Sequence, residues 1–178
     1  MFDGAPSANT YDSDLYGAFF SIGYELFKDK GRLQSTFVAA DIFDEQSELT
    51  RLNAQMNIVY AGAILHLFRL ETQEKVASRI VQLLIPQPGS LLIGRQSGSE
   101  NAGGFSGSGE TSGRKHFRHN VQSWVDLWKR VGEMTGTEWK VEADLDTPKF
   151  TLSAPKGRSV EIQNKMNSKD LRITVRRL

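Results

Sequence analysis

Apolar residues recur every three or four positions in three segments of the chain, and this spacing predicts three amphipathic helices. They cover residues 17–30, 70–84 and 120–135, with Gly31 and Gly136 placed to stop the first and the third. Unbroken apolar runs at residues 36–40, 56–63 and 90–94 predict short buried strands between the helices. Strands that are apolar on both faces are typical of a parallel sheet.

The pattern changes after the third helix to short runs that alternate or are bounded by turn residues. These runs lie at residues 139–145, 150–152, 160–162 and 171–175, and they predict antiparallel strands at the sheet edge. The full order of elements therefore predicts an α/β fold, mostly parallel with antiparallel strands at the C-terminus, and a single domain over residues 1–178.

Residues 96–113 differ in composition from the rest of the chain, because six of these eighteen residues are glycine and five are serine. Such a segment does not pack a core, so we predict a mobile loop. The loop is either a lid over a site or a surface insertion.

Composition excludes several functions. The chain has no cysteine, which excludes disulfides and thiolate catalysis, and its three histidines predict no metal site. Its 22 basic and 21 acidic residues give a net charge of +1, without the strong basic excess expected of a nucleic-acid-binding protein. The N-terminus lacks the features of a secretory signal, and the most apolar stretch, residues 58–68, is far shorter than the roughly 20 residues of a membrane span. We therefore expect no membrane association and a cytoplasmic location.

The charges are unevenly placed along the chain. Residues 1–50 hold nine acidic and three basic residues, and residues 156–178 hold seven basic and two acidic ones. Either the basic end recruits an anionic partner, or oppositely charged faces neutralise each other within the fold. The alternation in Arg172-Ile173-Thr174-Val175-Arg176 favours the second interpretation, since it places the charges on the solvent-exposed face of a half-buried strand.

Candidate site residues follow the predicted parallel strands, where ligands bind in open α/β sheets. Asp14 ends a short strand near residues 9–13, Asp41 ends the strand at 36–40, and His66 follows the strand at 56–63. Two carboxylates at neighbouring strand ends suit a nucleoside, whose ribose hydroxyls and exocyclic amine donate hydrogen bonds. Each Asp is equally typical of a turn or a helix cap.

The chain resembles the class I S-adenosylmethionine-dependent methyltransferases, and most closely those of fungal secondary-metabolite pathways that act on polyketides and meroterpenoids. The matching segments are DGAPSAN, YELFKDKGRLQSTFVAADIFD, IVYAGAILHLF, VASRIVQLLIPQPGSLLIGRQ and KHFRHNVQSWVDLWKRVGEMTGTEWKVEA. The resemblance implies a truncated Rossmann-like methyltransferase fold. It also implies that Asp14, Asp41 and Ile42 are the residues that would bind S-adenosylmethionine.

Two departures from the family bear on that cofactor. Family members carry, before the segment matching DGAPSAN, a strand that ends in a DxGxGxG-like loop, whereas this sequence begins at Met1-Phe2-Asp3-Gly4. Asp12 also stands where the family usually has a glycine before the acidic strand end. We therefore expect no cofactor, with S-adenosylmethionine as the alternative. A missing central strand would leave unpaired sheet edges, and for that reason we expect a homodimer.

Three functions stay open. The first is an enzyme that has lost methyl transfer and instead isomerises, cyclises or dehydrates a polyketide or terpenoid intermediate. The second is an S-adenosylmethionine-dependent methyltransferase, and the third is a non-catalytic partner of a full-length methyltransferase that binds through Phe19 and Phe20. The catalytic candidates for the first are proton-transfer groups and anion-stabilising groups: His66, His116, His119, Arg69, Arg95 and Tyr60. A hydrophobic small-molecule substrate is expected, with four apolar residues suited to either a cavity or a plain core: Phe43, Ile64, Phe68 and Trp124.

Overall fold

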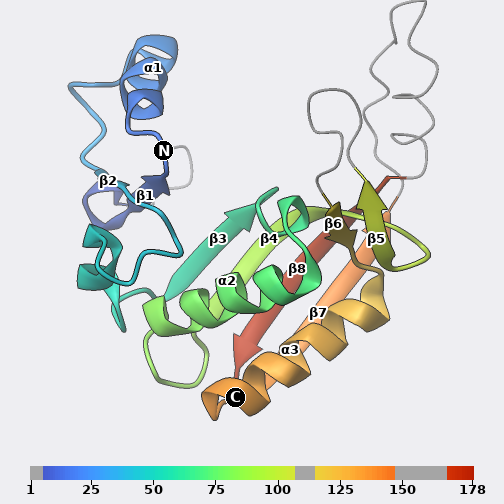
Figure 1. The fold of residues 1–178 in the computed structure, drawn as a ribbon. Coiled ribbons are helices and arrows are strands. Elements are labelled where there is room, and N and C mark those ends of the chain that lie inside the picture. Colours follow the sequence, from blue (N-terminus) through green and yellow to red (C-terminus); the bar gives the residue numbers. More distant parts are fainter. Residues whose placement is uncertain (1–5, 107–114, 147–167) are drawn as a thin grey trace, which may run out of the picture. The chain divides into compact units, whose positions relative to one another are not determined.

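The computed structural model describes residues 6–106, 115–146 and 168–178 (Figure 1). The chain divides into two compact units, Met1–Asn53 and Ala54–Leu178. The predicted strands at residues 150–152 and 160–162 lie outside the described residues. Among the described helices, none is long and apolar enough to cross a membrane.

The first unit is a βαβ unit with two parallel strands. Strand β1 (Tyr11–Asp14) pairs along its length with β2 (Thr36–Ala39), and helix α1 (Ala18–Phe27) connects them. Short 3-10 helices precede β1 at Ser7–Asn9 and follow β2 at Glu48–Leu52. The prediction of a strand that ends at Asp14 is confirmed.

Helix α1 has the predicted periodicity, but it ends earlier than expected and buries no residue. The residue after its last turn is Lys28, whose φ of 52° is left-handed, and the N–H of Lys28 donates to the carbonyl of Tyr24 at 2.9 Å. The prediction that Gly31 stops the helix was wrong. Phe20 and Tyr24 reach the sheet by contacting the ring of Phe37 in β2, with ring centroids 4.6 and 5.3 Å apart.

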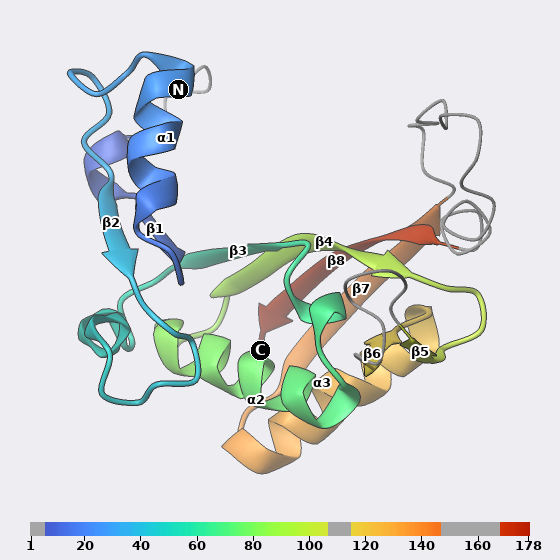
Figure 2. The ribbon, with the colours of Figure 1, turned by 45° about the horizontal axis from the view of Figure 1, so that its top comes forward.

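The second unit is built on a four-stranded sheet in the order β3-β4-β8-β7. Strands β3 (Ile58–Gly62) and β4 (Leu91–Gly98) are parallel, whereas β8 (Lys169–Arg177) and β7 (Trp139–Asp146) are antiparallel to their neighbours. Helices α2 (Leu70–Leu83) and α3 (Val121–Thr135) lie on the same side of this sheet (Figure 2). The predicted mixture of parallel and C-terminal antiparallel strands is confirmed.

The core of this unit lies between the sheet and the two helices. In β8 the apolar residues Leu171, Ile173 and Val175 are buried, while Arg172 and Arg176 are exposed, as the alternation predicted. The helices contribute their apolar stripes: Val76, Ile80 and Leu83 from α2, and Trp124, Leu127, Trp128 and Val131 from α3.

Both ends of α3 are capped, and the C-terminal cap is the glycine that the sequence indicated. Asn120 accepts a hydrogen bond from the N–H of Ser123 at 2.8 Å, and the Ser123 hydroxyl accepts one from the N–H of Asn120 at 3.0 Å. These reciprocal bonds form a capping box. Gly136 ends the helix with φ of 65°, a left-handed conformation that glycine adopts without strain.

Two segments differ from their predictions. The expected buried strand at residues 56–63 contains β3, which lies at the edge of its sheet with Ile58 and Tyr60 exposed. The expected loop at residues 96–113 begins as strand, because β4 continues through Gly98, and β5 (Gly103–Ser106) pairs with β6 (Lys115–Arg118). A Cβ on Gly98 would lie 2.7 Å from the side chain of Leu145 and 2.9 Å from the carbonyl oxygen of His119. That glycine therefore serves close packing.

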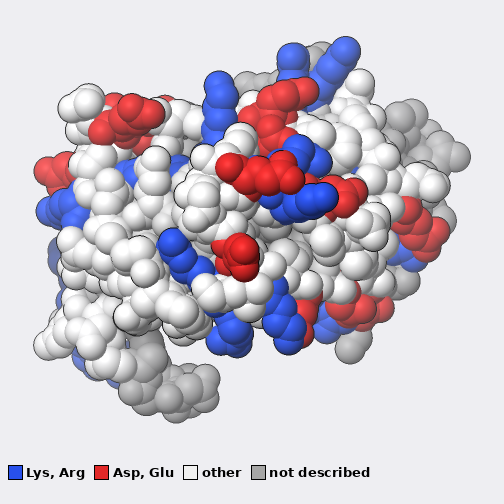
Figure 3. All heavy atoms as spheres, turned by 90° about the horizontal axis from the view of Figure 1, so that it is seen from below, with Lys and Arg blue, Asp and Glu red and all other residues white. Residues whose placement is uncertain are grey.

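The basic residues of β8 have acidic neighbours in the same unit. Arg172 donates at 2.9 Å to Asp144 and to Asp146 of β7, and Asp170 accepts from Arg95 of β4 at 3.2 Å. On the face drawn in Figure 3, acidic and basic side chains lie next to one another. Among the described residues, Arg172 is thus paired with carboxylates of its own unit, and the choice between the two interpretations stays a prediction.

Candidate functional site

A hollow of about 390 Å³ lies in the second unit, where β3 and β4 end and β8 begins. Because β3 and β4 are parallel, their carboxyl ends meet at one sheet edge, which is where open α/β sheets bind ligands. The antiparallel strand β8 adds its first residues to the same place. Most of the residues that line it have polar side chains: Tyr60, Gly62, Ala63, His66, Arg95, Gln96, Ser97, Ser168, Lys169 and Asp170.

The hollow brings together Tyr60, His66 and Arg95, three of the six residues predicted from the sequence to be catalytic. The other three, Arg69, His116 and His119, do not line it. The six predicted residues therefore do not form a single group.

A sharp turn after β3 places His66. Ala63 adopts a left-handed conformation with φ of 58°, and its N–H donates to the carbonyl of Arg95 at 2.7 Å. The chain then enters a 3-10 helix, Leu65–Leu67, which carries His66. The ring of Tyr60 lies against Gly62, and a Cβ there would be 2.6 Å from that ring. Glycine at this position therefore leaves room for the Tyr60 ring.

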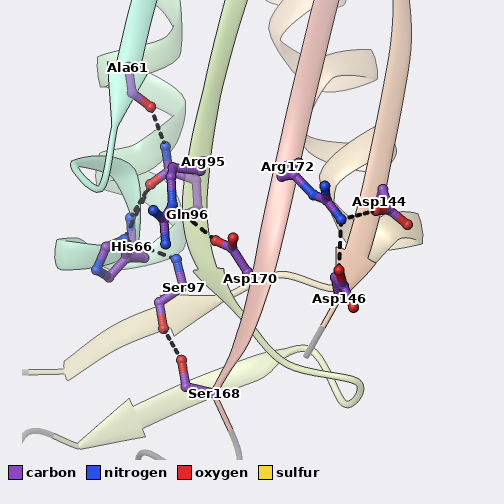
Figure 4. Close-up of polar contacts among 10 residues, drawn as sticks. All are labelled: Ala61, His66, Arg95, Gln96, Ser97, Asp144, Asp146, Ser168, Asp170 and Arg172. Carbon is purple, nitrogen blue, oxygen red and sulfur yellow. Dashed lines mark hydrogen bonds and ion pairs between the residues drawn. The ribbon is translucent and has the colours of Figure 1, made fainter. Parts of the chain in front are cut away.

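The imidazole of His66 is held on one side by two consecutive residues of β4 (Figure 4). Its Nδ1 lies 3.2 Å from Oε1 of Gln96 and 3.3 Å from the backbone nitrogen of Ser97. The other ring nitrogen, Nε2, lies on the far side of the ring. Among the described residues, no group forms a hydrogen bond with it.

Burial is the largest influence on the charge of His66 and lowers its pKa. The side-chain oxygen of Gln96 beside Nδ1 raises this pKa, while the positive charge of Arg118 lowers it. The net shift is downward from 6.5, so His66 is neutral at pH 7.

The rest of the hollow is organised by pairs across β4 and β8. Asp170 accepts from the guanidinium of Arg95 at 3.2 Å, and the hydroxyls of Ser97 and Ser168 are 2.5 Å apart (Figure 4). Arg95 keeps 62% of its side chain exposed. The hollow therefore offers an accessible cation together with a neutral imidazole.

His116 lies outside the hollow. It stands on β6 and stacks on Phe105 of β5, with ring centroids 6.2 Å apart. Burial lowers the pKa of His116, and the charges of Arg118 and His66 lower it further. His116 is therefore close enough to the hollow for the charge of His66 to affect it.

His119 belongs to the core of the second unit. One ring nitrogen lies 2.9 Å from the hydroxyl of Ser123 and the other 3.2 Å from the side-chain oxygen of Gln73, and the ring packs against Trp124. Burial lowers the pKa of His119 to about 4, with a smaller contribution from Arg130. The structure thus gives His119 a place in the packing between α2 and α3, away from the hollow.

Arg69 is exposed at the N-terminus of α2, where its carbonyl accepts from the N–H groups of Thr72 and Gln73. Trp124, one of the apolar residues suited to either a cavity or a core, is fully buried in the core. The other three apolar candidates do not line the hollow either: Phe43, Ile64 and Phe68.

The predicted cofactor residues lie in the first unit. Asp14 ends β1 and Asp41 stands two residues beyond the end of β2, so the two carboxylates belong to adjacent parallel strand ends. One oxygen of each carboxylate accepts the N–H two residues on, at 2.8 Å from Tyr16 and 2.9 Å from Phe43. These bonds fix the carboxylates and leave the second oxygen of each for a ligand. Ile42, next to Asp41, is half-buried, and the assignment of these three residues to S-adenosylmethionine stays a prediction.

Sequence reasoning missed Gln96, Ser97, Ser168, Lys169 and Asp170. The first two stand at the start of the segment whose composition predicted a loop, and the other three immediately precede the run at 171–175. The ends of the apolar runs were set too tightly in both cases. Among the described residues, no group of three or more His, Asp or Glu side chains could hold a metal ion.

Comparison with known proteins identifies relatives. O-methyltransferase phiE of Fungal sp. (strain ATCC 74256) is 48% identical over 139 residues, which are 78% of this chain and 46% of phiE. O-methyltransferase atr3 of Stereocaulon alpinum is 46% identical over 148 residues, 83% of this chain and 42% of atr3. The chain is homologous to fungal methyltransferases. This homology confirms the predicted resemblance to the methyltransferase-like proteins of fungal secondary-metabolite pathways.

The homology covers only part of the relatives and is not accompanied by a family match. The chain spans about half the length of the curated relatives it matches, between 42% and 51% of them. No protein-family model matches the chain.

Solved structures show the same fold. Burkholderia thailandensis 1,6-didemethyltoxoflavin-N1-methyltransferase, bound to 1,6-didemethyltoxoflavin and S-adenosylhomocysteine, matches with a TM-score of 0.60 at 12% identity, covering 94% of this chain and 60% of that one. The [4+2]-cyclase SpnF matches with a TM-score of 0.62 at 11% identity, covering 93% and 65%. These likenesses confirm the predicted methyltransferase fold. Because one neighbour is a methyltransferase and the other a cyclase, the fold alone does not decide the reaction.

Proposed function

We propose that this methyltransferase-like protein binds a small molecule with an acidic hydroxyl group, either an enol or a phenol, and stabilises the oxygen of that group as an anion. The reaction would be an isomerisation, cyclisation or dehydration of a polyketide or terpenoid intermediate, without methyl transfer. The observation that carries the proposal is the hollow that unites Tyr60, neutral His66 and Arg95 at the ends of two parallel strands.

Each of the three groups has a part in this chemistry. Arg95 supplies a positive charge that remains accessible although Asp170 is paired with it. The hydroxyl of Tyr60 and the imidazole of His66 form hydrogen bonds with oxygen atoms without adding charge. Hydrogen-bond donors and a cation that are already in place stabilise a developing oxyanion, and this is often the largest contribution to catalysis.

The polar side chains that line the hollow favour the polar end of such a substrate. An apolar remainder of the molecule would extend over Tyr60, which is 66% exposed. The expected hydrophobic substrate is consistent with this arrangement if its acidic oxygen enters the hollow.

The test uses 4-nitrophenol, because its phenolate absorbs visible light and its phenol form does not. Titration of the protein at a pH below the pKa of the free probe should raise the phenolate absorbance in a saturable manner, as the proton is released to water. His66→Gln and Arg95→Gln should each weaken this binding about tenfold, the loss expected for one charge-assisted hydrogen bond.

Arg172→Gln is the matched control for Arg95→Gln. Arg172 is also an exposed arginine of the same sheet that is paired with carboxylates, but it does not line the hollow. Equal effects of the two substitutions, or no saturable signal from the unmodified protein, would contradict the proposal.

Methyl transfer is the second candidate, favoured by the paired carboxylates Asp14 and Asp41 and by the names of the relatives. S-adenosylmethionine would supply the methyl group, and Asp14, Asp41 and Ile42 would hold its ribose and adenine. Calorimetric titration with S-adenosylhomocysteine tests this candidate. Saturable micromolar binding that Asp14→Asn and Asp41→Asn remove, and that Asp12→Asn retains, would support it, whereas no binding at millimolar ligand would remove the cofactor.

The homodimer remains a proposal. It is supported by the position of β3 at a sheet edge, with Ile58 exposed there at 57%. Light scattering that shows a monodisperse monomer would contradict it.

A further inference from the structure

The backbone N–H of Ser97, at the end of β4, bears on which ring nitrogen of His66 carries the proton. Leu91 donates its N–H to the carbonyl of Asn57, on the β3 side of the strand. Successive N–H groups alternate sides along a strand, so Ser97, six residues later, also directs its N–H toward the β3 side. The β3 backbone is no longer alongside at that level, because the chain turns away at Ala63.

The Nδ1 atom of His66 takes the place of the acceptor that β3 would have supplied. It lies 3.3 Å from the Ser97 nitrogen, and this contact requires a lone pair on Nδ1. A backbone N–H that is enclosed without an acceptor costs free energy comparable to a lost hydrogen bond. Accepting from Ser97 therefore favours an unprotonated Nδ1.

Gln96 holds this arrangement from the other side. Its side chain is buried, and its Oε1 accepts from the N–H groups of Leu65 at 3.1 Å and His66 at 3.4 Å. Its Nε2 donates to the carbonyl of Ala61 at 2.8 Å. Both lone pairs of the amide oxygen are thus used by backbone donors, and Gln96 does not need a proton on Nδ1 for its own hydrogen bonding.

We propose that the N–H of Ser97 holds neutral His66 in the tautomer that carries its proton on Nε2, and that Gln96 is a positioning residue that fixes the backbone of Leu65 and His66 so that Nδ1 meets this N–H. His66 then faces a ligand as a hydrogen-bond donor and does not act as the base. This inference rests on the proposed function and narrows its substrate class. The oxygen that meets His66 is an acceptor, namely a carbonyl, an enolate or a phenolate.

Nitrogen-15 NMR of the ligand-free protein tests the tautomer directly, because protonated and unprotonated ring nitrogens have well-separated shifts. At neutral pH, His66 should show an unprotonated Nδ1 and a protonated Nε2. The opposite assignment would overturn the inference, and that outcome requires no variant to fold.

Gln96→Glu tests the role of Gln96. A carboxylate beside Nδ1 should draw the proton there and raise the pKa of His66 against the opposing charge of Arg118 on β6. We also expect the binding of 4-nitrophenolate to weaken about tenfold, since a negative charge has replaced an amide beside the hollow. His119, which is held by Ser123 and Gln73, is the internal control and should keep its shifts.

A Gln96→Glu spectrum in which His66 keeps the wild-type tautomer and pKa would overturn the role of Gln96. The tautomer is measured without ligand, so it is separate from the proposed function. The predicted tautomer combined with no 4-nitrophenol binding would contradict the oxyanion site alone.

Discussion

The two units of the chain use the same kind of helix very differently. Helix α1 of the first unit buries none of its residues, although it has the apolar periodicity of a core helix. In the second unit α2 and α3 bury seven and five residues, and these include Trp124 and Trp128, whose exposure is 1% or less. Periodicity therefore predicts that a segment is helical, whereas burial determines how much that helix stabilises the fold.

The same contrast separates the two groups of candidate residues. Asp14 and Asp41 follow short strands of a unit with few buried residues. Tyr60, His66 and Arg95 are fixed by β3, β4 and β8, which share a core with the two helices. Groups that stabilise an oxyanion need fixed positions, and the second unit provides them.

The largest expected effect comes from removing an indole from the core. Trp128→Ala should lower the free energy of unfolding of the second unit by about 3–5 kcal/mol. Leu26→Ala in α1, where the side chain is 71% exposed, should change stability by about 0.5 kcal/mol or less. Urea unfolding followed by circular dichroism measures both, and comparable losses would show that α1 is buried as deeply as α3.

The second effect is a pH dependence that arises from His119. Burial holds its folded-state pKa at about 4, below the ordinary 6.5. As the pH falls from 6.5 toward 4, the unfolded chain takes up a proton that the folded protein refuses, so the free energy of unfolding decreases. The loss is about 3 kcal/mol over this range.

His119→Gln should flatten this part of the pH profile in urea unfolding measured between pH 4 and 7. His116→Gln is the matched control, because the ring of His116 is less buried and the profile should keep most of its slope. A profile unchanged by His119→Gln would contradict the buried, neutral state of His119.

A smaller effect is expected from closing the space between β3 and β4. Gly94→Ala would place a Cβ 2.2 Å from the carbonyl oxygen of Ala61, so the two strands must separate. We expect a loss of about 1–3 kcal/mol and weaker binding in the hollow that both strands line. In Gly104→Ala of β5, the new Cβ meets no atom of the described residues within 4 Å, so this variant should be nearly neutral. Urea unfolding of the two variants measures the difference.

The smallest effect concerns the start of α3. Asn120→Ala removes the side chain that accepts from the N–H of Ser123 and should cost about 1 kcal/mol. Gln122→Ala, two residues into the helix and exposed, should change stability by less than half that amount. Equal unfolding midpoints for the two variants would show that the capping box contributes little.

Much of the fold could be predicted because local pattern and packing agree in the second unit. The stripe of α2, the C-terminal end of α3 and the alternation in β8 were readable from single residues such as Gly136 and Ile173. In the first unit, Asp14 ends a strand as predicted.

The site could be predicted only in part. Tyr60, His66 and Arg95 were found because they stand at or near strand ends. The glycine and serine content of residues 96–113 predicted a loop that included Gln96 and Gly98. Glycine and serine also occur in strands that pack closely, and β4 is such a strand. The burial of His119 depends on Gln73 and Ser123, which reach it from different parts of the chain, and no local pattern reports that contact.

The most direct test of the central claim follows backbone amide signals during a titration with 4-nitrophenol. The oxyanion site predicts saturable shifts at Gly62, Ala63 and Ser97, with the amides that follow Asp14 and Asp41 unchanged. His66→Gln should reduce the shifts at the same ligand concentration. Shifts centred on the first unit, or spread evenly over both units, would contradict the claim that the hollow at the ends of β3 and β4 is the site.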